Sequence, residues 1–437
     1  MNLITLLPLF FWLFLHQQRK WSSFLEPPVF ITAFWTALIV IHASLGFDVD
    51  VSKNSVIIIF LFLLFFCLGY SLSTKTISTS PVKINDKDSF LIISFWVGVI
   101  SGLSAVIYLI ASSKQGLSSL SSINAYLEMT TELTSRRYRG HAEPIISRIL
   151  TLGHYNSAFL GGLLFAKISR TKWHSNLKFL TPIAVGILIT LTLTTRASTL
   201  FTLFLWVGGY LATRLALNNF KVSFKLLLGS AVLLILLSSL FIITLQIRYS
   251  IPFSNVTLAF EKFRLDFFSF LGPFSIWLNG FLLQETHTLS LGQYSFSGIY
   301  DKLGIAERAQ GIYIHSAFVS YGHPTNIYTS FRQLLQDFGI LGTNLIFLTL
   351  GGALRLALFK VRQNIYNGFH LVFLSVFFTS ALFSHITCIL NYNSIIITFI
   401  SAALCIEIQK AIHKHYKKTN NTLTPKNTPD ITIKNTH

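Results

Sequence analysis

The chain has 437 residues, of which 52% are hydrophobic and only 11% are charged, and its formal net charge is +18. A soluble globular protein carries about 25% charged residues, so this chain cannot supply the water-facing surface that several soluble domains would need. Apolar runs of roughly 18 to 22 residues separate the charged residues, and this length crosses the hydrocarbon core of a bilayer. The composition predicts a polytopic membrane protein and excludes a soluble enzyme, a nucleic-acid-binding protein and a secreted disulfide scaffold.

Recurring apolar segments predict an all-α fold with about eleven transmembrane helices. The predicted spans are residues 3–16, 29–47, 54–72, 89–112, 146–166, 179–195, 197–213, 226–246, 339–358, 369–386 and 393–409. Two connections are long, near 113–145 and at 247–338, and the second is rich in aromatic and aliphatic residues, which predicts a folded loop. The predicted layout is eight helices in residues 1–246, one large loop, three helices in 339–409 and a basic tail over 410–437.

The distribution of basic residues predicts the orientation of the helices. Alternate connections, together with the tail, contain 21 of the 34 Lys and Arg residues, and every short connection in this set is basic. Because cytoplasmic connections carry the excess of positive charge, this side is assigned to the cytoplasm. The N-terminus is then outside, the C-terminus is inside, and both long loops face the outer side.

Arginine is the preferred basic residue on the predicted outer side. Nine of its 13 basic residues are arginines, against five of the 21 on the cytoplasmic side. Orientation needs only positive charge, whereas guanidinium also forms two-pronged hydrogen bonds to phosphate and carboxylate groups and always stays charged. The bias predicts an anionic ligand, such as a pyrophosphate, at the outer face. The alternative is that these arginines pair with carboxylates of the same loops, namely Glu128, Glu132, Glu261, Asp266 and Glu307.

Arg196 is the sharpest single candidate. It lies in a tight turn between two apolar segments, in the sequence Thr-Thr-Arg-Ala-Ser, with no acidic residue near it in the chain. A charge inside or at the boundary of a membrane is costly and is therefore a site hypothesis by default. The alternative is an arginine that extends its charged head into water and only marks a helix end.

A second candidate region covers residues 322–339. Pro324 suits the first position of a helix and predicts an amphipathic helix over 324–338, with His323 at its N-cap. Histidine titrates near neutral pH, so His323 at this place is a candidate to accept a proton from a sugar hydroxyl or to contact an anion. The alternative is that His323 only caps the helix.

Further candidates come from the same part of the chain. Arg332 and Asn326 lie on the predicted helix, while His287, His315 and Asp337 are alternative proton acceptors that no spacing ranks. No P-loop, nucleophile elbow, HExxH motif or zinc-ligand spacing is present. The three cysteines are odd in number and predict neither a disulfide framework nor a metal cluster. We therefore expect no metal and no cofactor.

Together these features resemble the bacterial O-antigen polymerases, the Wzy-type polymerases of oligosaccharide repeat units. The resemblance rests on the large outer loop late in the chain, on Arg196 before a mid-chain helix, and on His323-x-x-Asn326 followed by Asp-Phe-Gly-x-x-Gly at 337–342. The layout covers nearly the whole chain. The motifs are confined to about 320–342 and to the neighbourhood of Arg196.

The resemblance implies a fold of the GT-C glycosyltransferase type and a reaction at the periplasmic face of the bacterial inner membrane, in lipopolysaccharide biosynthesis. The growing glycan passes from undecaprenyl pyrophosphate to the non-reducing end of a new lipid-linked repeat unit, without a nucleotide or a metal. The partners are the lipid-linked oligosaccharide and the bilayer, with a chain-length regulator protein left open. A lipid-linked oligosaccharide flippase, an O-antigen ligase and a membrane O-acyltransferase are the alternatives.

The resemblance also distributes roles among the candidates. Arg196 and His323 are expected to be catalytic, and the developing charge on the pyrophosphate is expected to be neutralised by arginines. The expected pyrophosphate-binding residues are Arg196, Arg248, Arg264 and Arg332. The secondary candidates are Asn326, His315, His287 and Asp337.

Overall fold

The computed structural model describes most of the chain. The described residues are 5–21, 23–44, 51–73, 88–138, 144–167, 176–218, 224–249, 251–252, 254–284, 288–307, 317–319, 323–325 and 327–423. The α-helices are α1 (Leu7–Lys20), α2 (Pro27–Ser44), α3 (Lys53–Leu72), α4 (Ser89–Ala111), α5 (Ile123–Tyr138), α6 (Ile145–Lys167), α8 (Thr181–Leu193), α9 (Arg196–Ala216), α10 (Phe224–Arg248), α11 (Val256–Phe268), α12 (Leu271–Leu282), α13 (Ser297–Lys302), α14 (Ser330–Gln363), α15 (Gly368–Phe383) and α16 (Asn393–Leu423). The remaining elements are the 3₁₀ helices η2 (Gly116–Ser121), η4 (Leu177–Leu180) and η6 (Ile389–Asn391) and the strands β1 (Ala317–Val319) and β2 (His323–Thr325).

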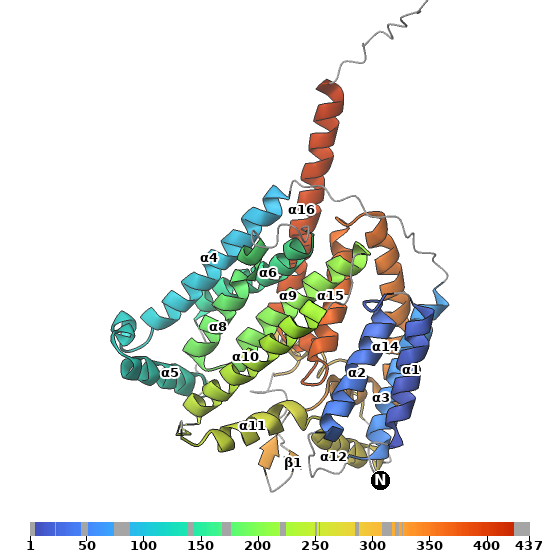
Figure 1. The fold of residues 1–437 in the computed structure, drawn as a ribbon, viewed down its shortest axis with the longest axis horizontal. Helices are drawn as coiled ribbons and strands as arrows, with labels where there is room; N and C mark the ends of the chain where they lie inside the picture. Colours follow the sequence, from blue (N-terminus) through green and yellow to red (C-terminus); the bar gives the residue numbers. More distant parts are fainter. Residues whose placement is uncertain are drawn as a thin grey trace, which may run out of the picture.

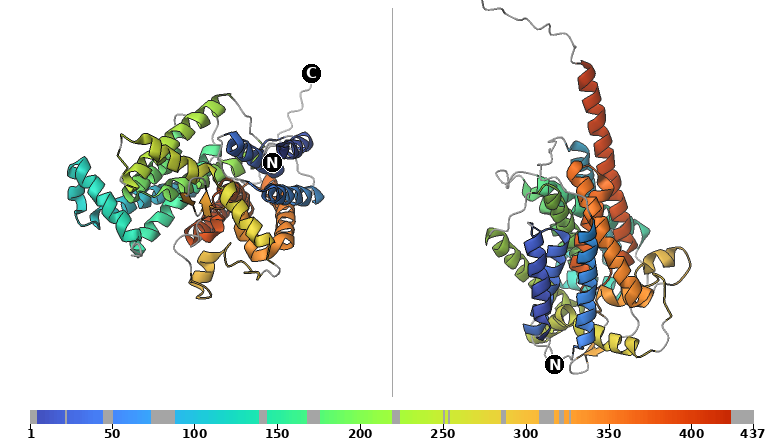
Figure 2. Two further views of the ribbon diagram at one scale, coloured as in Figure 1. Left: turned by 90° about the horizontal axis from the view of Figure 1, so that it is seen from below. Right: turned by 90° about the vertical axis from the view of Figure 1, so that its right-hand side faces the viewer.

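The long helices form a bundle with two distinct ends (Figure 1). One end carries α5, α11, α12 and the β1–β2 ribbon, and we call it the loop end. From the other end α16 projects well beyond the bundle, as a view from the side also shows (Figure 2), and we call it the tail end. The elements that the sequence predicts to lie in the two long outer loops therefore share one end of the molecule.

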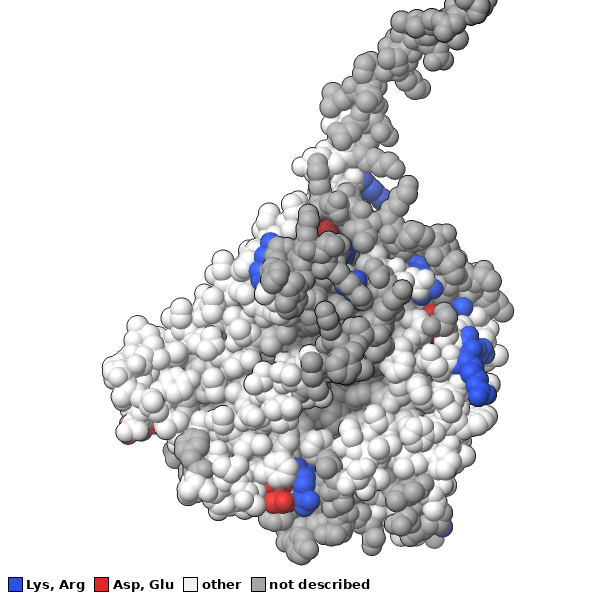
Figure 3. Space-filling model, viewed as in Figure 1, with Lys and Arg blue, Asp and Glu red and all other residues white. Residues whose placement is uncertain are grey.

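Seven helices among the described residues are long and apolar enough to cross a membrane: α2, α3, α4, α6, α9, α14 and the first part of α16. The pair α11–α12, bent by 47°, would make an eighth if it counts as one span. Three shorter apolar helices, Leu177–Leu193, Val232–Arg248 and Gly368–Phe383, coincide with predicted spans. The face shown in Figure 3 has almost no charged side chains across its described middle. The helical, polytopic membrane class is confirmed, and the count of eleven spans stays a prediction.

Glycine permits the closest helix contacts of the core. The most extensive contacts join α4 to α6, α6 to α9 and α3 to α14. A Cβ atom at Gly69 would lie 1.8 Å from the carbonyl oxygen of Leu348, and one at Gly162 would lie 1.9 Å from that of Trp206. Because backbone atoms cannot yield as a side chain can, α3–α14 and α6–α9 need glycine at these crossings to pack backbone against backbone.

Two ion networks hold helix ends together on the side away from the loop end. Glu26, just before α2, accepts a hydrogen bond from Tyr70 and pairs with Arg362 at 3.4 Å and Arg355 at 3.8 Å. These contacts tie α2 to α3 and α14. An ion that is removed from water is tolerated when it is paired and hydrogen-bonded in this way.

Asp88, just before α4, is the centre of the second network. Its carboxylate lies 2.9 Å from Lys167 Nζ, accepts a hydrogen bond from the Tyr366 hydroxyl at 2.8 Å and lies 3.8 Å from His413 Nε2. The network thus joins α4 to α6 and α16. All of these basic residues lie in connections, in helix ends or in the tail, which the sequence assigns to the cytoplasmic side.

The predicted amphipathic helix over 324–338 begins later than expected, and this prediction is wrong. Residues His323–Thr325 form β2, which pairs antiparallel with β1, so that Val319 faces His323 and Phe318 faces Pro324. Both strands of a two-stranded ribbon are edge strands, where a proline without an N–H is tolerated. The helix starts only at Ser330, and His323 is not its N-cap.

Gly339 divides α14 into a short first part and a long apolar part. Its φ of 65° and ψ of −176° belong to a region that is essentially reserved for glycine. The break turns the carbonyls of Gln336 and Asp337 toward the preceding loop, where they accept hydrogen bonds from the amides of Ser290 and Leu291. The break lies where the sequence predicts the span 339–358 to begin.

Candidate functional site

The α8–α9 turn positions Arg196. Thr194 has a φ of 47° at the C-cap of α8, Thr195 is the N-cap of α9, and Arg196 is the first residue of α9. The hydroxyl groups of Thr194 and of Thr134 on α5 are hydrogen-bonded to each other, which fixes the turn against a neighbouring helix. No side chain caps the start of α9 at Thr195, and the first amides of a helix have no acceptor within the helix.

Arg196 forms an ion pair that the sequence spacing does not reveal. Its Nη2 lies 2.8 Å from Oδ2 of Asp266 on α11, and the side chains are only 16% and 18% exposed. The guanidinium carbon also lies 5.6 Å from the centre of the Phe267 ring. Nη1 is buried and has no hydrogen-bond partner among the described residues. The alternative interpretation, in which outer arginines pair with carboxylates, is therefore confirmed for Arg196. One of its two terminal nitrogens nevertheless has no hydrogen-bond partner among the described residues.

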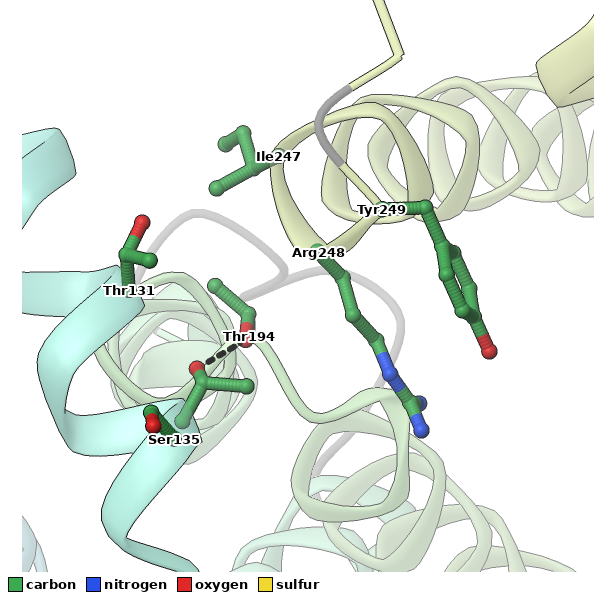
Figure 4. Close-up of a pocket in the computed structure, with 7 residues that line it drawn as sticks. Thr131, Ser135, Thr194, Ile247, Arg248 and Tyr249 are labelled. Carbon is green, nitrogen blue, oxygen red and sulfur yellow. Dashed lines mark hydrogen bonds between the residues drawn. The ribbon is translucent and has the colours of Figure 1, made fainter. Parts of the chain in front are cut away.

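A cavity of about 340 Å³ lies beside this turn (Figure 4). It is lined by side chains from α5, from the α8–α9 turn and from the end of α10, namely Thr131, Thr134, Ser135, Thr194, Ile247, Arg248 and Tyr249. The close-up shows the Arg248 and Tyr249 side chains extending the same way from the end of α10, past the hydroxyl-bearing residues of α5 and the turn. The cavity thus combines hydroxyl groups with a guanidinium.

Positive charge continues along the rim of this cavity. Lys262 Nζ on α11 lies 4.2 Å from the centre of the Tyr249 ring, and the Arg248 guanidinium carbon lies 5.2 Å from the same centre. A cation over a tyrosine face is attracted by the quadrupole of the ring. Guanidinium and hydroxyl groups around one hollow, with an ammonium over the ring of a lining tyrosine, form an arrangement suited to the oxygens of a phosphate group.

Two other outer arginines have carboxylate partners on their own helices. Arg264 pairs with Glu261 at 2.8 Å on α11, with side chains that are 30% and 46% exposed. Arg136 pairs with Glu132 on α5. Exposed pairs of this kind contribute little to stability and do not require a ligand. The carboxylate alternative is thus confirmed for both residues.

Arg332 does not line the cavity. Its buried guanidinium lies 3.9 Å from the ring centre of Tyr328 and 5.2 Å from that of Trp277 on α12. Two aromatic faces around one guanidinium form a cation–π contact that holds the first turn of α14 against α12. The structure therefore separates Arg332 from the cavity that Arg248 lines.

The surroundings of Asp337 indicate a structural role. It is fully buried, and its carboxylate accepts hydrogen bonds from the amides of Tyr294 at 3.0 Å and Ser295 at 2.6 Å. Both oxygens of this predicted proton acceptor are thus engaged by the backbone of the loop before α13. Its contacts match those of a residue that fastens the loop to α14.

The histidine candidates are described only in part. The backbone of His323 lies in β2, and its side chain is outside the described part of the chain. His287, His315 and Asn326 also lie outside the described residues. These four assignments stay predictions. In the described ranges, no group of three or more His, Cys, Asp or Glu side chains is placed to hold a metal ion.

Three features of the cavity and of the candidate arginines were missed in the sequence. Thr131, Thr134 and Ser135 of α5 share one face of a helix at spacings of three and four, a pattern that could have been noticed but is common on helices. The role of Tyr249 and the aromatic faces around Arg332 could not have been found, because they depend on how distant elements pack.

Comparisons of this chain with protein-family models, with curated proteins and with solved structures found no match.

Proposed function

We propose that this chain is a membrane glycosyltransferase that polymerises lipid-linked repeat units, as O-antigen polymerases do. The proposed donor is a growing glycan on undecaprenyl pyrophosphate, and the acceptor is the non-reducing end of a new lipid-linked unit. In this proposal the chain resides in the bacterial inner membrane with a GT-C-like fold of about eleven spans. Its loop end faces the periplasm, and its tail lies in the cytoplasm.

One observation supports this proposal most. The guanidinium and hydroxyl groups around the cavity of Arg248 and Thr194 adjoin the uncapped start of α9, where Arg196 has an unfilled Nη1. A helix N-terminus and arginine side chains both favour phosphate oxygens. The cavity lies at an end of the bundle, so a lipid could keep its chain in the bilayer while its diphosphate reached these groups.

The proposed reaction requires few further groups of the protein. The acceptor hydroxyl oxygen attacks the anomeric carbon of the donor sugar, the bond from that carbon to the phosphate oxygen breaks, and undecaprenyl pyrophosphate leaves. Arg196 and Arg248 stabilise the negative charge that develops on this leaving group. The hydroxyl proton passes to a base, for which His323 is our candidate. Because the backbone engages both oxygens of Asp337, we do not propose Asp337 for this role.

The test is genetic complementation read on a lipopolysaccharide gel. A cell that lacks the chain should show single repeat units on the lipid core, and the wild-type chain should restore the ladder of chain lengths. Arg196→Ala and Arg248→Ala should each reduce the ladder by 100-fold or more, about the effect of removing one charge-stabilising donor from an active site. Bare lipid core in the deletion strain would instead indicate a ligase.

Arg136→Ala is the matched control, since Arg136 lies on α5 close in sequence to the cavity residues but pairs with Glu132. It should leave the ladder unchanged. Chain levels must be equal on an immunoblot. A full ladder from both Arg196→Ala and Arg248→Ala would contradict the proposed role of the cavity.

A further inference from the structure

Asp266 satisfies only one arm of the Arg196 guanidinium. The contact runs from Nη2 to Oδ2 at 2.8 Å, while Nη1 is buried with no hydrogen-bond partner among the described residues. A ligand with several oxygens on one centre can engage both arms of a guanidinium at once, which makes the contact stronger and more directional. The carboxylate on α11 is therefore an incomplete partner for this arginine.

Other hydrogen-bonding capacity at the same helix start is also unused. The Thr195 side chain is 9% exposed, and its hydroxyl has no partner among the described residues. The amide of Thr199, one turn into α9, donates a hydrogen bond to the Thr190 hydroxyl at 3.0 Å, so this amide is not available to a ligand. A buried polar group without a partner costs free energy, which a bound ligand would recover.

We propose that Asp266 is a resting counter-ion of Arg196 that the diphosphate of a lipid substrate displaces and that a monophosphate leaves in place. The inference rests on the function proposed for this site. A ligand that takes Arg196 must outcompete a carboxylate held at 2.8 Å in a largely buried position. A diphosphate has more charge and more oxygens than a monophosphate, so it can bind Arg196, the start of α9 and Arg248 together. The dephosphorylated lipid, undecaprenyl phosphate, would then not displace Asp266 from Arg196.

Binding of purified chain in nanodiscs to undecaprenyl pyrophosphate and to undecaprenyl phosphate tests the proposal. The wild type should prefer the diphosphate. Asp266→Asn keeps the shape of the side chain and removes its charge, and it should tighten binding of the diphosphate about tenfold, since a charged hydrogen bond no longer has to be broken. Binding of the monophosphate, which does not displace Asp266, should gain less, so the preference for the diphosphate should grow.

Glu261→Gln is the matched control, because Glu261 is a carboxylate on the same helix that pairs with the more exposed Arg264. Both dissociation constants should stay within about twofold of the wild type in this variant. An equal gain of affinity in Glu261→Gln and Asp266→Asn would show that the net charge of the protein causes the effect, and it would overturn the proposal. An unchanged lipid preference in Asp266→Asn would overturn it as well.

Hydrogen exchange of the wild type provides a second measurement that does not depend on a variant folding. Undecaprenyl pyrophosphate should speed exchange of the backbone amides of residues 262–268, because the tie between α9 and α11 is released, and undecaprenyl phosphate should not. Identical exchange with the two lipids would overturn the proposal. A wild type that binds neither lipid refutes this inference and the proposed function together, whereas binding as expected without a ladder in cells refutes only the proposed reaction.

Discussion

Replacement of Asp337 separates a structural role from a catalytic one. Its carboxylate accepts two backbone hydrogen bonds, from Tyr294 and Ser295, in a fully buried position. In Asp337→Ala both amides lose their acceptor, and a buried donor without a partner costs about 1–3 kcal/mol. The expected loss of stability is therefore roughly 2–6 kcal/mol. Asp337→Asn keeps one acceptor oxygen and should lose about half as much.

The assay is thermal unfolding of purified chain in detergent, followed by tryptophan fluorescence and by recovery on size-exclusion chromatography. The order of stability should be wild type, then Asp337→Asn, then Asp337→Ala, and the ladder of chain lengths should fall with the amount of folded chain. If Asp337→Ala instead unfolds at the wild-type temperature while polymerisation is abolished, Asp337 is a proton acceptor and the structural reasoning is refuted.

Three further predictions concern stability and use the same unfolding assay. Gly69→Ala should cost about 1–3 kcal/mol because the new Cβ meets a backbone oxygen at 1.8 Å, whereas Gly280→Ala, with nothing within 4 Å, should not destabilise; equal effects would refute the close contact of α3 with α14. Lys167→Met leaves the largely buried Asp88 without its nearest cation and should lower the free energy of unfolding by about 3–5 kcal/mol. Adding Asp88→Asn should restore part of this stability, whereas effects of the two substitutions that simply add up would contradict an interaction between Lys167 and Asp88. Arg332→Lys should cost roughly 1–2 kcal/mol through lost contact with two rings, and no difference from wild type would argue against that contact.

Long apolar windows were predicted well from the sequence. The windows 54–72 and 89–112 correspond to α3 (Lys53–Leu72) and α4 (Ser89–Ala111) with ends that agree within a residue. Such segments need no partner to become helical, because a bilayer leaves the backbone few other ways to satisfy its hydrogen bonds. Their helical state follows from local composition alone.

The large loop was harder to predict, for identifiable reasons. In α11 the charged residues Glu261, Lys262, Arg264 and Asp266 interrupt the apolar pattern, so neither a span nor a regular amphipathic helix was evident. In the ribbon, Pro324 gave a helix-start signal that strand pairing with Phe318 overrode. Pairing between segments is a tertiary property and leaves no mark on either segment by itself.

The candidate site, like the fold, was predictable from the sequence only in part. Arg196 was identified because a charge between two apolar segments is visible in the sequence. Its partner Asp266 was only one of several possible carboxylates, since the fold, and not the spacing in the sequence, brings the two residues together. The aromatic faces of Tyr328 and Trp277 around Arg332 likewise required the fold.

The central claim is that the diphosphate of a lipid substrate binds at the loop end, between the start of α9 and the end of α10. The most direct measurement is an experimental structure of the chain in nanodiscs with undecaprenyl pyrophosphate. Phosphate oxygens should lie about 3 Å from guanidinium nitrogens of Arg196 or Arg248, with Asp266 turned away from Arg196. A diphosphate bound instead beside the basic residues around Glu26 or Asp88, with the cavity at Arg248 empty, would contradict the account.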